Sequence, residues 1–400
     1  MSRYNPKVFI NVDTLSEIKI ERLQAFLLCF PDFCDEQGLG SDSEKITYEN
    51  ISNAFLNVGN CEKNKDEAHD LMEALQSISE MANLDSRAIL GAMGKAQKLT
   101  LLDGADVSDA DFALHCWLTH QSLFAAAYAK GRVKNFQSFL YFNGKGRAEK
   151  PFPEIDDEKT NALQADINAW LKENGRMPNC KAYFFPHGER LSIVLKYGMP
   201  MIRDRASKKN GDSEGVFYNP QKHDLLIYHR IHNEISLNTP NISQQDDVYR
   251  RLIGKHLFND EAYFDEEKEF SLAELQKVEA PRNFLSPGIK KATLVELTYD
   301  WGFEKEIRQS TDLQKTLIRR NKSELEKKPD IVSAKFKLIL DKKGNHQRMV
   351  TLENSNKARL DRSEDGLLIE DWVRAQNFLK AKEKPQELEN VDTVKESVFA

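Results

Sequence analysis

The 400-residue sequence has no long apolar run. Its longest apolar stretches, at 25–30 and 124–128, are far shorter than the ~20 residues that a membrane-spanning helix requires. The first ten residues also lack the apolar segment and the small-residue cleavage site of a secretory signal. We therefore expect an intracellular, cytoplasmic protein with no membrane partner.

Cysteines are few, and their spacing does not indicate disulfide or metal-binding pairs. The chain has five cysteines, an odd number, and no Cys-x-x-Cys pair. A secreted disulfide framework would be denser and usually even in number. We expect reduced thiols that pack as small apolar residues.

Glycine-rich phosphate-binding loops are absent as well. The nearest patterns, Gly91-x-x-Gly94-Lys95 and Gly144-x-Gly146, do not complete a P-loop and do not follow a clear strand. The sequence therefore offers no ground for a nucleotide, and we expect no cofactor. We also expect no metal, although two sets of residues named below have the side chains to bind one.

Length and composition indicate a globular protein of two or three domains. Hydrophobic residues make up 40% of the chain and charged residues 30%. The first part of the chain reads as helical: Leu23, Phe26, Leu27 and Phe30 follow the spacing of an amphipathic helix, which Pro31 is expected to stop. We predict a helical domain over residues 1–150.

After a segment rich in Gly, Pro and charge at 144–153, short strand-like runs replace the helical pattern. Successive short strands with tight turns favour antiparallel pairing. We predict an antiparallel β-meander with flanking helices over 151–280, then a basic α/β unit over 281–380, and a disordered tail over 381–400. The basic unit should contain two strands, 331–340 and 347–352, joined by a turn at 341–345, and a last helix at 367–379. The fold class is α+β.

Charge is unevenly distributed along the chain. The net charge is −6 overall, but residues 1–150 hold 16 Lys and Arg against 21 Asp and Glu, a net of −5. Residues 282–348 hold 16 against 9, a net of +7. Opposite charges on two parts of one chain indicate different partners for each part.

The basic segment carries the candidate nucleic-acid contacts. It combines a charged helix at 312–326 with the basic tip of the predicted hairpin, a layout that resembles a winged helix. The competing interpretation is a solvated helix beside an edge hairpin kept soluble by lysines. The candidate binding residues are Lys315, Arg319, Arg320, Lys322, Lys342, Lys343 and Arg348.

Other constellations have a chemical and a structural interpretation. His223, His229, His232 and Glu234 could bind a metal, although His232 should lie in a turn. Cys116 and His120 have the spacing of a nucleophile and its base, but both could equally be core residues.

Carboxylates that could hold catalytic metal ions are Glu296 and Asp300, or Asp330 with Asp341-Lys-Lys343. Basic residues of the meander (Arg190, Lys196, Arg203 and Arg205) alternate with aromatic ones (Tyr183, Phe184 and Tyr197), as on surfaces that bind single-stranded nucleic acid. The competing interpretation is that the aromatic residues form the buried face of the meander.

Three functional hypotheses follow. The first is a non-enzymatic component that binds nucleic acid through its basic region and a protein partner, or a second copy, through the acidic helical part. The second is a protein–protein scaffold, and the third is a metal-dependent nuclease or other hydrolase. No motif identifies a family; the general character is that of bacterial accessory proteins, including those of defence and mobile-element loci.

Overall fold

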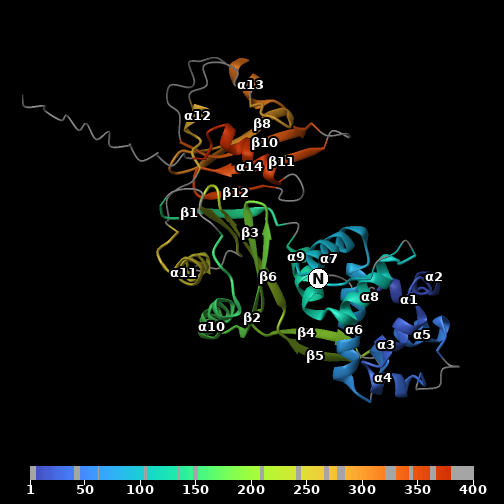
Figure 1. The fold of residues 1–400 in the computed structure, drawn as a ribbon. Helices are drawn as coiled ribbons and strands as arrows, with labels where there is room; N and C mark the ends of the chain where they lie inside the picture. Colours follow the sequence, from blue (N-terminus) through green and yellow to red (C-terminus); the bar gives the residue numbers. More distant parts are fainter. Residues whose placement is uncertain are drawn as a thin grey trace, which may run out of the picture. The chain divides into compact units, whose positions relative to one another are not determined.

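The structure is a computed structural model (Figure 1). It describes residues 6–39, 46–61, 63–102, 104, 106–133, 136–146, 152–207, 211–239, 245–264, 270–276, 284–319, 330–341, 346–360 and 366–379. No helix of these described ranges is long and apolar enough to span a membrane.

The N-terminal third is helical, as its apolar spacing predicts. Its elements are α1 (Lys7–Ile10), α2 (Val12–Leu15), α3 (Ile20–Leu27), α4 (Pro31–Glu36), α5 (Tyr48–Leu56), η2 (Val58–Asn60), α6 (Lys65–Met81), α7 (Leu84–Ala96), α8 (Asp109–Thr119) and α9 (Gln121–Arg132). Side-chain caps begin several of them: Asn64, Asn83 and Ser108 each accept a backbone N–H of the first turn of α6, α7 and α8.

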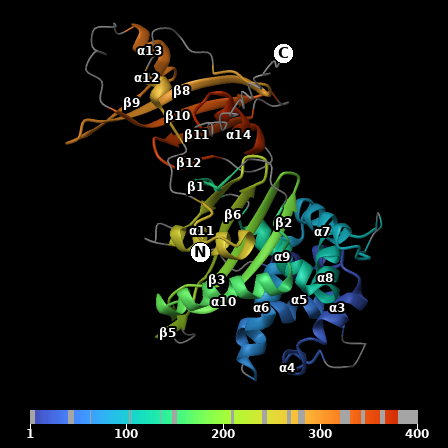
Figure 2. The ribbon, with the colours of Figure 1, turned by 60° about the vertical axis from the view of Figure 1, so that its left-hand side comes forward.

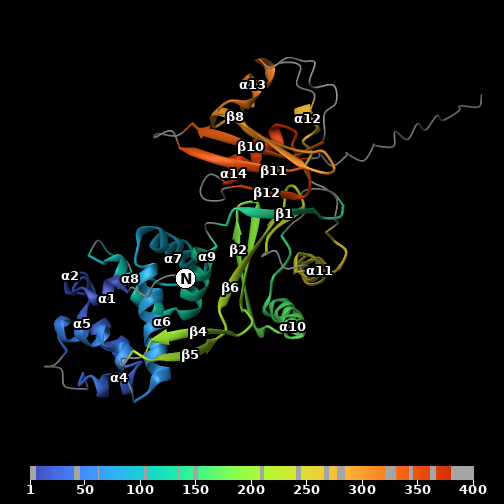
Figure 3. The ribbon, with the colours of Figure 1, turned by 180° about the vertical axis from the view of Figure 1, so that it is seen from behind.

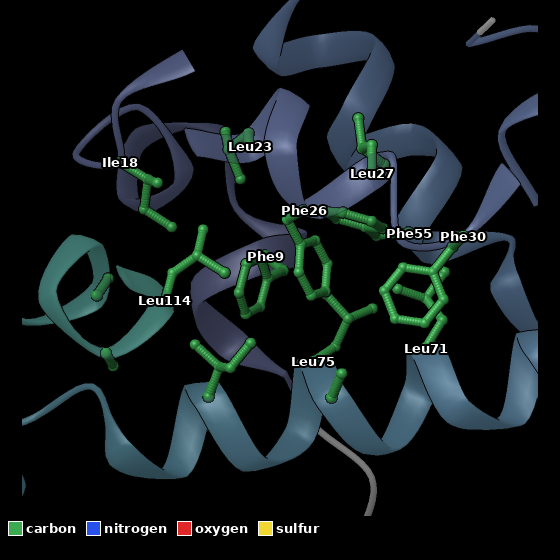
Figure 4. Close-up of a cluster of buried hydrophobic side chains, with 14 of the residues drawn as sticks. Phe9, Ile18, Leu23, Phe26, Leu27, Phe30, Phe55, Leu71, Leu75 and Leu114 are labelled. Carbon is green, nitrogen blue, oxygen red and sulfur yellow. The ribbon is translucent and has the colours of Figure 1, made fainter. Parts of the chain in front are cut away.

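Phenylalanine dominates the core of this helical part. Phe9, Phe26 and Phe55 are at most 1% exposed, and their rings meet edge-on or stacked at 5.6–6.2 Å (Figure 4). The predicted stripe is buried, but Pro31 does not stop its helix. The helix α3 already ends at Leu27, and Pro31 opens α4 at its first position, where the missing N–H costs nothing.

The remainder of the chain builds a sheet with helices around it. Its strands are β1 (Ser138–Asn143), β2 (Met177–His187), β3 (Arg190–Gly198), β6 (Gln221–His229), β7 (Glu234–Asn238), β8 (Ile289–Asp300), β9 (Lys305–Gln309), β10 (Asp330–Leu340), β11 (Gln347–Glu353) and β12 (Lys357–Arg359). Within the described ranges these ten strands are ordered β2-β3-β6-β7-β1-β12-β11-β10-β8-β9. A separate ribbon pairs β4 (Ile202–Ser207) with β5 (Ser213–Tyr218), and the helices are α10 (Asp157–Glu173), α11 (Gln245–Phe258), α12 (Ala273–Gln276), α13 (Leu313–Arg319) and α14 (Gly366–Ala375).

The α+β class is therefore confirmed: N-terminal helices precede a mostly antiparallel sheet and a C-terminal helix. The two predicted strands are β10 and β11, which pair antiparallel from Ser333↔Glu353 to Ile339↔Gln347. They are inner strands of the ten-stranded sheet and not an isolated wing.

Backbone contacts group the chain into two compact units. Unit 1 comprises Met1–Lys134, Thr160–His187 and Ser192–Leu225, and unit 2 comprises Asn135–Lys159, Gly188–Leu191 and Leu226–Ala400. Each unit is made of three separate segments of the chain, whereas the three domains predicted from composition are consecutive segments. Those three domains stay a prediction.

Unit 2 has its own core between its strands and α14; Figure 3 shows the ribbon of these elements from behind. Trp372 of α14 is fully buried and its ring lies 5.2 Å from that of Phe336 on β10. The indole N–H donates to the Phe284 carbonyl over 2.6 Å. The polar group of this large side chain is thus satisfied, as burial requires.

Candidate functional site

The predicted nucleic-acid residues lie only partly within the described chain. Lys315 is an exposed residue of α13, with its ammonium 3.3 Å from Asp312, and Arg319 is the last residue of that helix. Arg348 lies on β11, where its guanidinium donates to the Gln347 carbonyl. The other four, Arg320, Lys322, Lys342 and Lys343, lie outside the described residues.

Strand pairing places further cations at the end of the strands that holds Arg348, which is the partner of Leu338 and therefore lies on the face opposite Lys337. Lys290 and Lys291 begin β8, and Lys337 lies on β10, two residues from Ile339, the partner of Lys291. Lys291 and Lys337 therefore share one face of the sheet on neighbouring strands. We call Lys290, Lys291, Lys337 and Arg348 the basic end of unit 2. The described residues of 289–292 and 337–349 contain these four cations and one carboxylate, Asp341.

The opposite end of the same strands is acidic. Five carboxylates, against the two cations Lys305 and Arg308, occupy the described residues 298–312 and 330–333: Asp300, Glu304, Glu306, Asp312 and Asp330. Lys291 of the basic end and Asp300 of the acidic end are nine positions apart on β8, which corresponds to roughly 30 Å at ~3.3 Å per residue. Figure 2 shows β8 and β9 extending to this acidic end. The charge separation was missed from the sequence because it depends on strand pairing.

The acidic end also carries exposed aromatic residues. A tight turn joins β8 to β9: the Trp301 N–H donates to the Glu304 carbonyl over 2.9 Å, and Gly302 has a φ of +86°. Trp301 is 38% exposed and Phe303 85% exposed. Side chains of this size are seldom left so open, and no local pattern in the sequence indicates their exposure.

The histidine cluster divides between the two units. In unit 2, the rings of His229 and His232 lie 4.4 Å apart, tilted by 34°. Burial, followed by the neighbouring His232 and Arg190, lowers the pKa of His229 to about 3. In unit 1, burial, followed by Lys196 and Arg132, lowers the pKa of His223 to about 4. Both imidazoles are therefore neutral at pH 7.

Buried ion pairs surround His229 and His232. Arg190 pairs with Glu370 of α14, and Arg374 of the same helix pairs with Glu234 of β7. Glu234 and Glu370 are only 4% and 5% exposed. The Tyr141 hydroxyl donates to Glu370 Oε1 over 3.3 Å.

Charges buried this deeply require partners, and here each carboxylate has its arginine. Within unit 2 the arrangement therefore holds α14 against Arg190 and against β7 rather than presenting free ligands. Because Arg190 is paired with Glu370, it is not available for the basic and aromatic surface expected for the meander. Tyr197, an aromatic residue of that expected surface, is buried in unit 1, and its hydroxyl donates to Asp224 over 2.8 Å.

The carboxylates proposed for metal-ion catalysis are only partly brought together. Asp300 and Asp330 are direct partners on β8 and β10, and Glu296 lies 3.6 Å from the Lys335 ammonium. Asp341 follows the far end of β10, roughly 35 Å from Asp330 at the rise of an extended strand. The Asp330 and Asp341-Lys-Lys343 pattern therefore does not form one site.

Cys116 and His120 do not form a catalytic pair. Cys116 is fully buried in α8, and burial raises the pKa of its thiol to about 11. Such a thiol is not ionised at pH 7 and is a poor nucleophile. The contact between these residues is the helical bond from the His120 N–H to the Cys116 carbonyl.

Neither a search for metal-binding clusters nor a comparison with known proteins identifies a function. Within the described ranges, no group of three or more His, Cys, Asp or Glu could hold a metal ion. A scan against protein-family models and a search of curated proteins both find no match to the chain.

Proposed function

We propose that this protein binds nucleic acid through the basic end of unit 2. The observation that carries the proposal is the gathering of Lys290, Lys291, Lys337 and Arg348 at one end of a sheet whose other end is acidic. Phosphate neutralisation by Lys and Arg supplies most of the sequence-independent affinity for DNA and RNA. The acidic end repels the same backbone and so directs it to the basic end.

The predicted contacts extend this surface. Lys342 and Lys343 stand in the sequence between β10 and β11, next to the basic end, and stay part of the proposal on that ground. Lys315 and Arg319 belong to α13, which follows the acidic end in the chain, and are expected to contribute less.

The test is fluorescence anisotropy with labelled single- and double-stranded DNA and RNA at two salt concentrations. The wild type should bind more weakly at the higher salt. Changing Lys290, Lys291, Lys337 and Arg348 to Gln should reduce the slope of log K against log salt by about 1 for each phosphate that is no longer neutralised.

A matched control variant removes the same number of charges elsewhere. Lys65, Lys95, Lys172 and Lys181 are exposed residues of unit 1, and changing them to Gln lowers the net charge equally. This variant should retain most of the affinity. Equal losses of affinity in both variants, or no binding by the wild type at the lower salt, would refute the proposal.

If the protein does not bind nucleic acid, a role as a protein–protein scaffold is the favoured alternative. Its support is the exposure of three leucines in the acidic helical part: Leu28 at 80%, Leu56 at 57% and Leu84 at 76%. Changing these leucines to Lys should then abolish co-purification of a partner protein, while the basic-end variant should retain it.

A further inference from the structure

The strand β9 ends the sheet among the described residues. It pairs on one side with β8, from Glu296↔Gln309 to Asp300↔Lys305. Its five residues are Lys305, Glu306, Ile307, Arg308 and Gln309. An edge strand can pair with a strand of another chain, and most edge strands carry features that prevent this pairing. The side chains of β9 therefore determine which strand could pair with it.

The backbone of β9 offers one set of groups to a further strand. Ser310 donates its N–H to the Val295 carbonyl, and Trp301 donates to Glu304, so even-numbered residues of β9 face β8. In an antiparallel strand the alternate residues turn their N–H and C=O the other way. Lys305, Ile307 and Gln309 therefore direct theirs to the edge, where no described residue is bonded to them.

The side chains of β9 complement a second copy of the same strand. If two copies pair antiparallel about Ile307, Glu306 of each faces Arg308 of the other, and Lys305 faces Gln309. The register is the one that the outward backbone groups allow, because the two Ile307 residues form a hydrogen-bonded pair. Three such pairs give six backbone hydrogen bonds.

Opposite charges are neighbours in this register both within each strand and across the two strands. Within one chain, Arg308 Nε donates to Glu306 Oε1 over 2.6 Å. Across the two strands each carboxylate would have a guanidinium opposite it, so that the four charges alternate in sign around the central isoleucines. Opposite charges facing each other across strands stabilise pairing, whereas like charges destabilise it.

We propose that the protein forms a homodimer by antiparallel pairing of β9 with β9 of a second copy. The side chain of Ile307, 60% exposed in the single chain, and Phe303, 85% exposed, supply apolar area to this interface. Because the strand is short, the interface is small and the dimer should dissociate in the micromolar range. The proposal does not depend on nucleic-acid binding, since the basic end lies at the other end of β8.

Charge reversal tests the register directly. In Glu306→Arg the new cation faces Arg308 of the second copy, and in Arg308→Glu two carboxylates face each other. Each variant alone should be monomeric in sedimentation velocity over a concentration series that spans the wild-type transition. An equimolar mixture of the two variants should dimerise again, because every pair then joins opposite charges.

The double variant Glu306→Arg/Arg308→Glu should also dimerise, since it restores the alternation within one chain. The matched control Glu173→Arg changes an exposed charge at the end of α10 and should dimerise like the wild type. A wild type that stays monomeric at every concentration, or reversal variants that dimerise as well as the wild type, would overturn the proposal. Neither result bears on the anisotropy experiment, whose readout is affinity for nucleic acid.

Discussion

The buried ion pair between Arg190 and Glu370 provides the strongest single prediction about stability. Glu370 is 5% exposed on α14, and the side chain of Arg190 on β3 is 14% exposed. Changing Glu370 to Ala removes the acceptor of both Arg190 Nη2 and the Tyr141 hydroxyl. Truncating one partner of a buried pair costs about 3–5 kcal/mol, because the other charge stays buried.

The cost is large against the whole free energy of unfolding. A stability of about 5–15 kcal/mol is usual for a folded domain, so a cost of about 3–5 kcal/mol for Glu370→Ala should remove about a fifth or more of it. Urea denaturation followed by tryptophan fluorescence measures this change, since Trp372 lies two residues from Glu370 in the same helix. Asp371→Ala is the matched control, because Asp371 is the exposed neighbour of Glu370, and it should change the free energy of unfolding by less than about 0.5 kcal/mol.

A second variant separates the charge from the packing. Replacing both partners, as Arg190→Met with Glu370→Leu, removes the buried charges together and should recover most of the stability. If Glu370→Ala costs less than about 1 kcal/mol, or if the double variant is no more stable than Glu370→Ala, the assigned role of the pair is wrong.

Three further predictions follow from burial. Phe26→Ala should cost about 3–5 kcal/mol in urea denaturation because its ring is fully buried among other phenylalanines, whereas Leu28→Ala, at 80% exposure, should be near neutral. The pKa of His229 is lowered to about 3, so between about pH 6.5 and 3 the unfolded chain binds a proton at His229 that the folded chain does not. The free energy of unfolding should therefore fall with decreasing pH in that window by up to about 1.4 kcal/mol per pH unit. His229→Phe should reduce this dependence of the free energy of unfolding on pH. Cys29 is the exposed cysteine of the five, so iodoacetamide at pH 8 should label one thiol quickly in the folded protein, and Cys29→Ser should abolish that phase; fast labelling of several thiols would contradict the buried assignment.

The sequence was sufficient for the elements whose signal is local. The stripe of Leu23, Phe26 and Leu27 predicted a buried helical face, and the two strands predicted at 331–340 and 347–352 pair as β10 and β11. Helical and strand periodicity are properties of neighbouring residues, so they can be recognised without a fold. The end of α3 was placed wrongly because a proline is equally suited to the first turn of the next helix.

The sites depended on contacts between residues far apart in the chain. Arg190 and Glu370 are 180 positions apart, and no local pattern connects them. The basic end likewise combines Lys291 with Lys337 through strand pairing, and the exposed edge of β9 exists only because the sheet order places it last. The sequence by itself thus predicted the helical N-terminal part, the strands β10 and β11 and the net charge of each segment, but it extended the last helix to 379, whereas α14 ends at Ala375. The tertiary structure alone decided which charges meet, because register and sheet order bring distant residues together and local propensity does not encode them.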